Sequence, residues 1–156
     1  MEGDRIWSPF LRVLRNGSER GTALIETALT LPLILLVSVG IFEFGRAYQM
    51  AQVLTNAARE GARVAVLPGS SAENVKSRVI AYLESGQVPN ASTATVVVKP
   101  DTTISYGSGS ATGSKVTVNY PFSFMVLNPV VRLVAKESTL GSAPITMSAS
   151  AEMRNE

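Results

Sequence analysis

The sequence contains neither histidine nor cysteine, and this absence excludes several kinds of functional site. The chain cannot build a Ser-His-Asp or Cys-His catalytic arrangement, a zinc site of the usual nitrogen and sulfur type, or a disulfide. An enzyme that uses Asp, Glu, Lys, Ser or Tyr is not excluded in this way, but no spacing of those residues proposes one. We therefore expect no enzymatic activity, no catalytic residue, no metal site and no cofactor.

Aromatic residues and clustered charge are also scarce. Aromatic residues make up 6% of the chain and hydrophobic residues 46%, so the apolar content is mostly Ala, Val and Leu. The 14 basic and 12 acidic residues are scattered, and no basic run is dense enough to follow a phosphate backbone. We therefore expect no nucleic-acid partner and no small-molecule substrate. A length of 156 residues allows one modest domain with a separate anchor.

One long apolar run follows a basic N-terminal leader, residues 1–21. Residues 22–42 carry a single charge, and a helix of this length is about 31 Å long, which matches a hydrocarbon core of ~30 Å. The run is longer than the apolar region of a secretory signal, roughly 7–15 residues, and no clear Ala-x-Ala site follows it. A buried core helix is the other alternative. We predict a transmembrane helix over residues 22–43.

The arginines predict the orientation of this helix. Four of them precede the span, at positions 5, 12, 15 and 20, whereas only Arg46 and Arg59 fall within about 20 residues after it. The positive-inside rule then places the N-terminus in the cytoplasm and the rest of the chain outside the cytoplasmic (inner) membrane, in a single-pass topology. Glu43, at the outer end of the span, is expected at the membrane interface, where a charge is inexpensive.

The helical pattern continues beyond the span, so we predict one helix from about Thr22 to Val66, with an amphipathic part at 44–66. Pro68 and Gly69 end it. Its apolar face consists of small and apolar residues: Ala47, Met50, Ala51, Leu54, Ala57, Ala58, Gly61 and Ala65. A small-residue patch on this helix either contacts the C-terminal sheet or allows close approach between the helices of neighbouring subunits; its members are Ala57, Ala58, Gly61 and Ala62.

The remaining sequence predicts a small α/antiparallel-β head over residues 44–156, so the fold class is α+β. A second helix is predicted over 72–86, with Ser70 and Glu73 as a capping box. "TATVVVK" and "KVTVNYPF" are typical of strands and flank "GSGSATGS", which we expect to be a flexible loop. "PITMSASAEM" alternates strictly and predicts a strand. "SFMVLNPVVRLVAKE" fits either a short helix or a turn-rich segment.

Glu26 is the one charge within the apolar run. A carboxylate inside a membrane span costs about 2.5–3.5 kcal/mol on insertion scales, so such residues usually have a functional partner. The alternative is that Glu26 lies near the cytoplasmic end of the span and reaches water at little cost. Its position alone leaves both interpretations open.

The surroundings of Glu26 resemble a known pattern. A basic leader ends in Gly21, Thr22 follows, Glu26 is the fifth residue after Gly21, and an apolar helix containing Pro32 runs into an amphipathic helix. This resembles the type IV-like prepilins. Residues 20–66 are similar to the TadE-like minor pilins or pseudopilins of tight-adherence (Flp) pilus systems, whose "AlxlP" and "AAREGAR" motifs are matched here. One departure is Thr27, because an aromatic residue is common there in the family.

The resemblance implies a role in assembling an adhesive pilus. A prepilin peptidase would cut between Gly21 and Thr22, and Glu26 would neutralise the new N-terminal amine of a neighbouring subunit. Residues implied in helix packing are Pro32, Ala57, Ala58, Gly61 and Ala62. The implied partners are the peptidase, other pilins, pilus assembly proteins and the membrane, with incorporation into an extracellular pilus. The alternative is a single-pass protein with an uncleaved anchor and an extracytoplasmic binding or scaffold domain.

Overall fold

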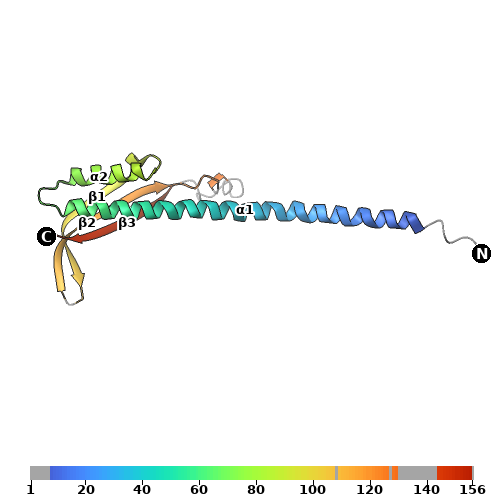
Figure 1. Ribbon diagram of the computed structural model, residues 1–156, viewed down its shortest axis with the longest axis horizontal. Helices are drawn as coiled ribbons and strands as arrows, with labels where there is room; N and C mark the ends of the chain where they lie inside the picture. Colours follow the sequence, from blue (N-terminus) through green and yellow to red (C-terminus); the bar gives the residue numbers. More distant parts are fainter. Residues whose placement is uncertain (1–7, 108, 127, 130–143, 156) are drawn as a thin grey trace, which may run out of the picture. The chain divides into compact units, whose positions relative to one another are not determined.

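The computed structural model describes residues 8–107, 109–126, 128–129 and 144–155. The chain divides into two compact units, Met1–Ile41 and Phe42–Glu156, and the second is called the head unit below. The elements are α1 (Ser8–Ala65), α2 (Ala72–Ser85), the 3-10 turn η1 (Ala91–Thr93), β1 (Thr95–Tyr106), β2 (Gly109–Phe122) and β3 (Ile145–Arg154), as labelled in Figure 1. The predicted α+β class, with a long N-terminal apolar helix, is confirmed.

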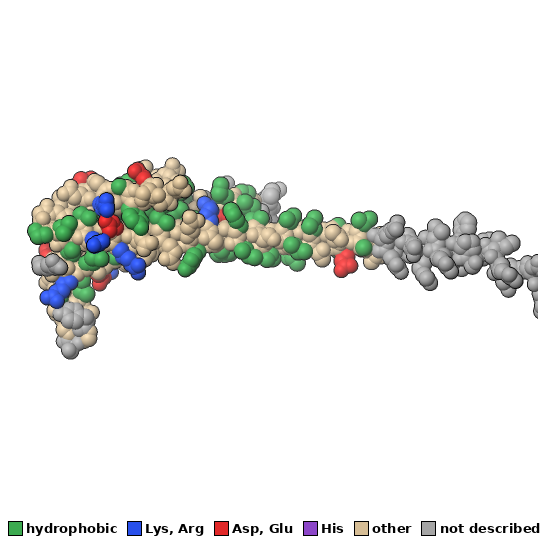
Figure 2. Space-filling model, viewed as in Figure 1, with side chains coloured by type: hydrophobic (Ala, Val, Ile, Leu, Met, Phe, Trp, Pro, Cys, Tyr) green, Lys and Arg blue, Asp and Glu red, His purple; other side chains and the backbone are tan. Residues whose placement is uncertain are grey.

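Helix α1 includes the predicted helix and begins earlier, at Ser8, within the predicted leader. Its stretch from Gly21 to Ala65 contains a window long and apolar enough to cross a membrane, and none of that window is buried by the protein. Figure 2 shows hydrophobic side chains standing out from this stretch. The core helix of a soluble protein is mostly covered, so this exposure contradicts the buried-helix alternative. The finding supports a single-pass membrane anchor.

Hydroxyl groups in the apolar part of α1 are bonded to the helix's own backbone. The Oγ1 atom of Thr27 donates to the carbonyl of Ala23 at 2.8 Å, and the Oγ atom of Ser38 donates to the carbonyl of Ile34 at 2.8 Å. Water is absent from a hydrocarbon core, so a polar group there must find its partner within the protein. These i to i−4 bonds let the hydroxyls occupy a membrane span without an unsatisfied donor.

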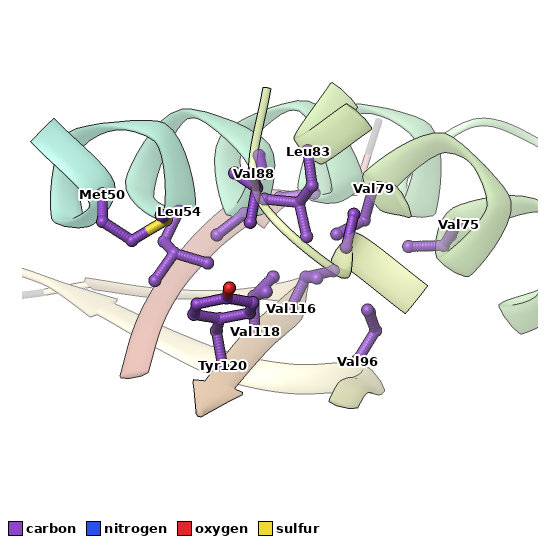
Figure 3. Packing of buried hydrophobic residues seen from close by; sticks show 14 of the residues in the cluster. Met50, Leu54, Val75, Val79, Leu83, Val88, Val96, Val116, Val118 and Tyr120 are labelled. Carbon is purple, nitrogen blue, oxygen red and sulfur yellow. The ribbon is translucent and has the colours of Figure 1, made fainter. Parts of the chain in front are cut away.

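The hydrophobic core of the head unit lies between the second half of α1, helix α2 and the sheet (Figure 3). α2 contributes Val75, Val79 and Leu83 at intervals of four residues, which places them on one face of the helix. Alternate residues of β2 face the same core, and they are Val116, Val118, Tyr120 and Phe122. The hydroxyl of Tyr120 donates to the carbonyl of Pro89 at 2.6 Å, so the polar end of this ring is satisfied.

Helix α2 ends at Ser85, as predicted to within one residue, but the predicted N-cap is wrong. Ser71, not Ser70, is the N-cap, and its Oγ atom accepts a hydrogen bond from the backbone amide of Asn74 at 3.2 Å. The Oγ atom of Ser70 is buried and has no hydrogen-bond partner. The helix therefore begins one residue later than the capping-box pattern predicted, since Glu73 lies three residues after Ser70 but only two after Ser71.

The three strands form one antiparallel sheet in the order β1-β2-β3. The expectation of a flexible loop at residues 107–114 is wrong from Gly109 onward, because this stretch belongs to β2 and pairs with the second half of β1. Thr112 lies opposite Thr103, for example. The register shifts between Lys99 and Thr102, where Asp101 has a positive φ of 53°. Strand pairing thus outweighs the weak local preference of a Gly- and Ser-rich segment.

The alternation predicted for the last strand is confirmed in β3. Met147, Ala149, Ala151 and Met153 are partly buried and pack against the core, whereas the residues between them are exposed. Ile145, at the start of the strand, is exposed instead. Residues 127 and 130–137 of the ambiguous segment lie outside the described residues, so the choice between a short helix and a turn-rich segment stays open there.

Candidate functional site

The residues predicted for cleavage and assembly lie on α1 and are open to their surroundings. A Cβ atom added at Gly21 would meet nothing within 4 Å. Glu26 is exposed, and among the described residues no hydrogen-bond donor or cation reaches its carboxylate. Its backbone carbonyl accepts a hydrogen bond from the Oγ1 atom of Thr30 at 2.9 Å, as part of the helix. The described part of the chain therefore leaves the Glu26 carboxylate available for a partner outside the chain.

The small-residue patch has a different environment, inside the head unit. Ala57, Ala58 and Ala62 are completely buried. A Cβ atom added at Gly61 would lie 2.6 Å from Cγ2 of Val79 and 3.1 Å from Cγ1 of Val116, so α1 approaches α2 and β2 closely here. The patch is occupied by contacts within the chain, which is the first of the two alternatives considered for it. Pro32 is exposed on α1, and its role in helix packing stays a prediction.

A cluster that the sequence analysis missed lies at Glu43. The carboxylate of Glu43 is 1% exposed and accepts hydrogen bonds from the backbone amides of Met125, at 3.2 and 3.0 Å, and of Val126, at 3.3 Å. Nη2 of Arg46 donates to the same carboxylate at 3.4 Å. The head unit itself surrounds this carboxylate, so Glu43 is not an exposed charge, and its place at the membrane interface stays a prediction.

Arg46 connects this cluster to an aromatic group. Its Nη2 atom also donates to the carbonyl of Ser123 at 2.6 Å, and its guanidinium carbon lies 4.6 Å from the centre of the Phe122 ring. The ring of Phe124 meets that of Phe122 edge to face at 5.3 Å and that of Phe44 at 5.9 Å. Together these contacts fasten residues 122–126 to α1.

The described residues provide no arrangement for metal chemistry. No group of three or more His, Cys, Asp or Glu side chains within that part of the chain is placed to hold a metal ion. The cluster at Glu43 has its carboxylate committed to hydrogen bonds with the chain, which is an arrangement suited to holding structure together. The geometry therefore points to two features. One is an exposed apolar helix whose Glu26 carboxylate is not engaged by the described residues, and the other is a head unit whose segment 122–126 is held against its own part of α1.

Comparison with known proteins agrees with these features. Residues 21–63 match the family model of the TadE-like proteins, and the match begins at Gly21 and ends within α1. No curated protein and no solved structure matches the chain. TadE-like proteins are structural or accessory proteins of pili and are not known as enzymes. The resemblance is thus confirmed over residues 21–63, and the chain carries a TadE-like segment that, with its N-terminal apolar helix, indicates a protein associated with a Tad pilus.

Proposed function

We propose that this chain is a minor pilin or pseudopilin that takes part in assembling a tight-adherence (Flp, type IVb-like) pilus, and that a prepilin peptidase matures it between Gly21 and Thr22. The observation that carries the proposal is the position of the TadE-like match, which begins at Gly21, directly before the exposed apolar stretch of α1. The chain acts as a structural subunit and as a substrate of the peptidase.

Cleavage at this position changes the charge of the helix end. Removing residues 1–21 creates an α-amino group at Thr22, which is protonated near neutral pH because such groups have pKa values of about 7.7–8.0. The amine then lies at the start of an apolar helix, where an isolated positive charge is unfavourable. A carboxylate from a neighbouring subunit would offset this cost.

Glu26 is suited to that role. It is exposed and, among the described residues, unengaged by the chain, and it lies about one helical turn after Thr22. When the helices of two subunits lie side by side, the carboxylate of one can meet the amine of the other. This pairing would fix how far one helix is shifted along the other, and the exposed apolar side chains of residues 24–42 would fill the filament core.

The same features define the proposed location. In the unassembled subunit the apolar stretch lies in the inner membrane, with the N-terminus in the cytoplasm and the head unit outside. Assembly moves that stretch from lipid into contact with other pilins, which are the proposed partners together with the pilus assembly proteins. The exchange of one apolar environment for another is close to neutral in hydrophobic free energy. Specific contacts, such as the pair between Glu26 and the neighbour's amine, therefore decide whether the subunit leaves the lipid for the filament.

The proposal is tested by the mass of the protein extracted from membranes, which shows whether the chain begins at Met1 or Thr22. Gly21→Leu should block cleavage, since the peptidase site must fit a residue without a side chain. Gly40→Leu is the matched control, because a Cβ at Gly21 or at Gly40 meets nothing within 4 Å. The control should be cleaved normally.

Two results would contradict the proposal. A wild-type chain that still begins at Met1 in cells with an active prepilin peptidase would support the alternative, an uncleaved anchor with an extracytoplasmic binding or scaffold domain. A Gly21→Leu protein with the same mature mass as the wild type would show that the cut lies elsewhere.

A further inference from the structure

We propose that the head unit carries a collar of apolar side chains that lies in the headgroup region of the membrane. The collar consists of Phe42, Phe44 and Tyr48 on α1, together with Met125 and Val126, which the Glu43 cluster holds beside the helix. The inference rests on residues 22–41 being a membrane span. It does not depend on cleavage or on the role of the chain in a pilus.

The exposure of these side chains is the first observation. Phe42, Phe44, Tyr48 and Met125 are 73%, 63%, 69% and 68% exposed, whereas the core residues Leu54 and Leu83 are completely or almost completely buried. Phe44 contacts Phe124, and Met125 is bonded to Glu43, so Met125 lies at the level of Phe42 and Phe44 along α1. Several exposed large apolar side chains at one level of a small domain mark an interaction site.

The position of the collar along α1 selects the partner. Residues 22–41 form about 30 Å of helix, the thickness of the hydrocarbon core, and residues 42–48 add about 10 Å, close to the ~5–8 Å of headgroup region on each side of a bilayer. Aromatic side chains are enriched at that depth, where their rings prefer the interface between lipid and water. After Tyr48 the exposed residues of α1 are polar, beginning with Gln49 and Gln52.

The two charged side chains within this part of α1, Glu43 and Arg46, are engaged by other residues of the head unit. Glu43 is buried under the amides of Met125 and Val126. The Arg46 side chain is 26% exposed, with its guanidinium held by Glu43, the carbonyl of Ser123 and the Phe122 ring. The Glu43 carboxylate is therefore enclosed by the chain and is not part of the outer surface. Its burial leaves the collar with uncharged outer side chains, which fits the edge of a bilayer.

The geometry favours lipid over a protein partner for these residues. The collar follows the apolar span along one helix, the two charges in this part are engaged by the head unit, and the collar ends where glutamines begin. Ile145, whose backbone pairs with Phe122, is also exposed, so a further apolar side chain lies at this end of the sheet. A second copy of the chain is the other possible occupant, and the experiment separates the two.

The experiment measures the depth of single tryptophans in vesicles. The full-length chain with its only tryptophan replaced, Trp7→Phe, receives one of four substitutions: Leu33→Trp, Phe44→Trp, Tyr48→Trp or Gln52→Trp. Each protein is reconstituted into phosphatidylcholine vesicles whose acyl chains carry bromine either near the headgroup or near the chain ends. Bromine quenches only tryptophans close to it. Gln52 is the matched control, since it lies one turn beyond Tyr48 on the same face of α1.

We expect Leu33→Trp to lose most fluorescence with the deep bromines, and Phe44→Trp to lose most with the shallow ones. Tyr48→Trp should follow Phe44→Trp with a smaller loss, and Gln52→Trp should change little with either lipid. If Leu33→Trp is quenched but Phe44→Trp and Tyr48→Trp lose no more than Gln52→Trp, the collar proposal is wrong and a protein partner covers these residues. If Leu33→Trp is not quenched either, the membrane span itself is wrong and the collar proposal falls with it. The mass of each sample reports cleavage separately.

Discussion

Glu43 and Met125 are 82 residues apart in sequence, yet both carboxylate oxygens of Glu43 accept the backbone amide of Met125, at 3.2 and 3.0 Å. This bond joins the part of α1 that directly follows the apolar span to the segment that leaves β2. A buried carboxylate is favourable only when its hydrogen bonds are made, so the contact fixes one conformation of the segment. The head unit therefore begins within α1 at about Phe42.

The first prediction is that Phe42–Glu156 folds when expressed alone, because this unit has its own core and contains the complete Glu43 cluster. A chain beginning at Gln49 lacks Glu43 and Arg46 and should be less stable, although it should still be soluble. Urea unfolding followed by circular dichroism compares the two. Equal midpoints for both fragments would show that the cluster contributes nothing to stability.

The second prediction concerns Glu43 itself. Glu43→Ala leaves the amides of Met125 and Val126 without an acceptor and should lower the free energy of unfolding of the head unit by about 3 kcal/mol. Glu43→Gln keeps one acceptor oxygen and should have a smaller effect. The matched control is Glu60→Ala, which removes a partner of Arg78 at the surface and should lose no more than about 1 kcal/mol. A loss at Glu43 no larger than at Glu60 would contradict this account of the cluster.

The third prediction tests the close approach at Gly61. Gly61→Ala places a methyl group against Val79 and Val116 and should destabilise the head unit by about 1–3 kcal/mol, although alanine is the better helix former. In a Val79→Ala background the same change should be less harmful, and a double-mutant cycle measures the difference. Gly45→Ala is the control, since its Cβ meets nothing within 4 Å. It should be stabilising by up to about 1 kcal/mol.

The fourth prediction compares two adjacent serines. Ser71→Ala removes the N-cap of α2 and should lower stability by about 1 kcal/mol. Ser70→Ala removes a buried hydroxyl that has no partner and should be neutral or slightly stabilising. Thermal unfolding of the head unit distinguishes them. A larger loss of stability with Ser70→Ala than with Ser71→Ala would show that Ser70 is the N-cap, as the capping-box pattern predicts.

The fifth prediction concerns the Glu26 carboxylate in assembly. Glu26→Ala should still insert and be cleaved, but it should fail to support pili, because an unpartnered buried amine costs roughly 3–5 kcal/mol per contact. Glu26→Asp should be intermediate, since its carboxylate is one methylene shorter. Electron microscopy of pili and the mature mass give the two readouts. Normal pili built from cleaved Glu26→Ala protein would rule out the pairing, and an uncleaved anchor would tolerate the change or gain from it.

Local pattern was sufficient to predict the elements whose residues repeat regularly. The apolar face of α1 around Leu54 and Ala58 follows the helical period, and β3 alternates from Met147 to Met153, so both were predicted. Patterns of this kind depend only on neighbours in the chain. They also placed Glu26 at the start of an apolar helix, where the structure leaves it exposed.

Features that depend on distant contacts could not be predicted in this way. The sequence gives no sign that the Glu43 carboxylate is buried until Met125 is placed beside it, and the only local signal was the opposite charge of Arg46 three residues later. The glycines and serines of 109–114 have low strand preference, and they become a strand because β1 extends beside them. The choice between Ser70 and Ser71 depends on one residue of helix boundary, which sequence patterns rarely fix.

The register shift between Lys99 and Thr102 divides the β1–β2 hairpin into two parts with different stabilities. Strand β3 pairs with β2 only from Gly113 to Phe122, so residues 102–106 and 109–112 form a ribbon of two strands, which Figure 1 shows pointing away from α1 and α2. A two-stranded ribbon is marginally stable in water, and none of its described side chains is fully buried. Its amide protons should therefore exchange with solvent much faster than those of Val116 and Val118, and its tip can vary in length without disturbing the core.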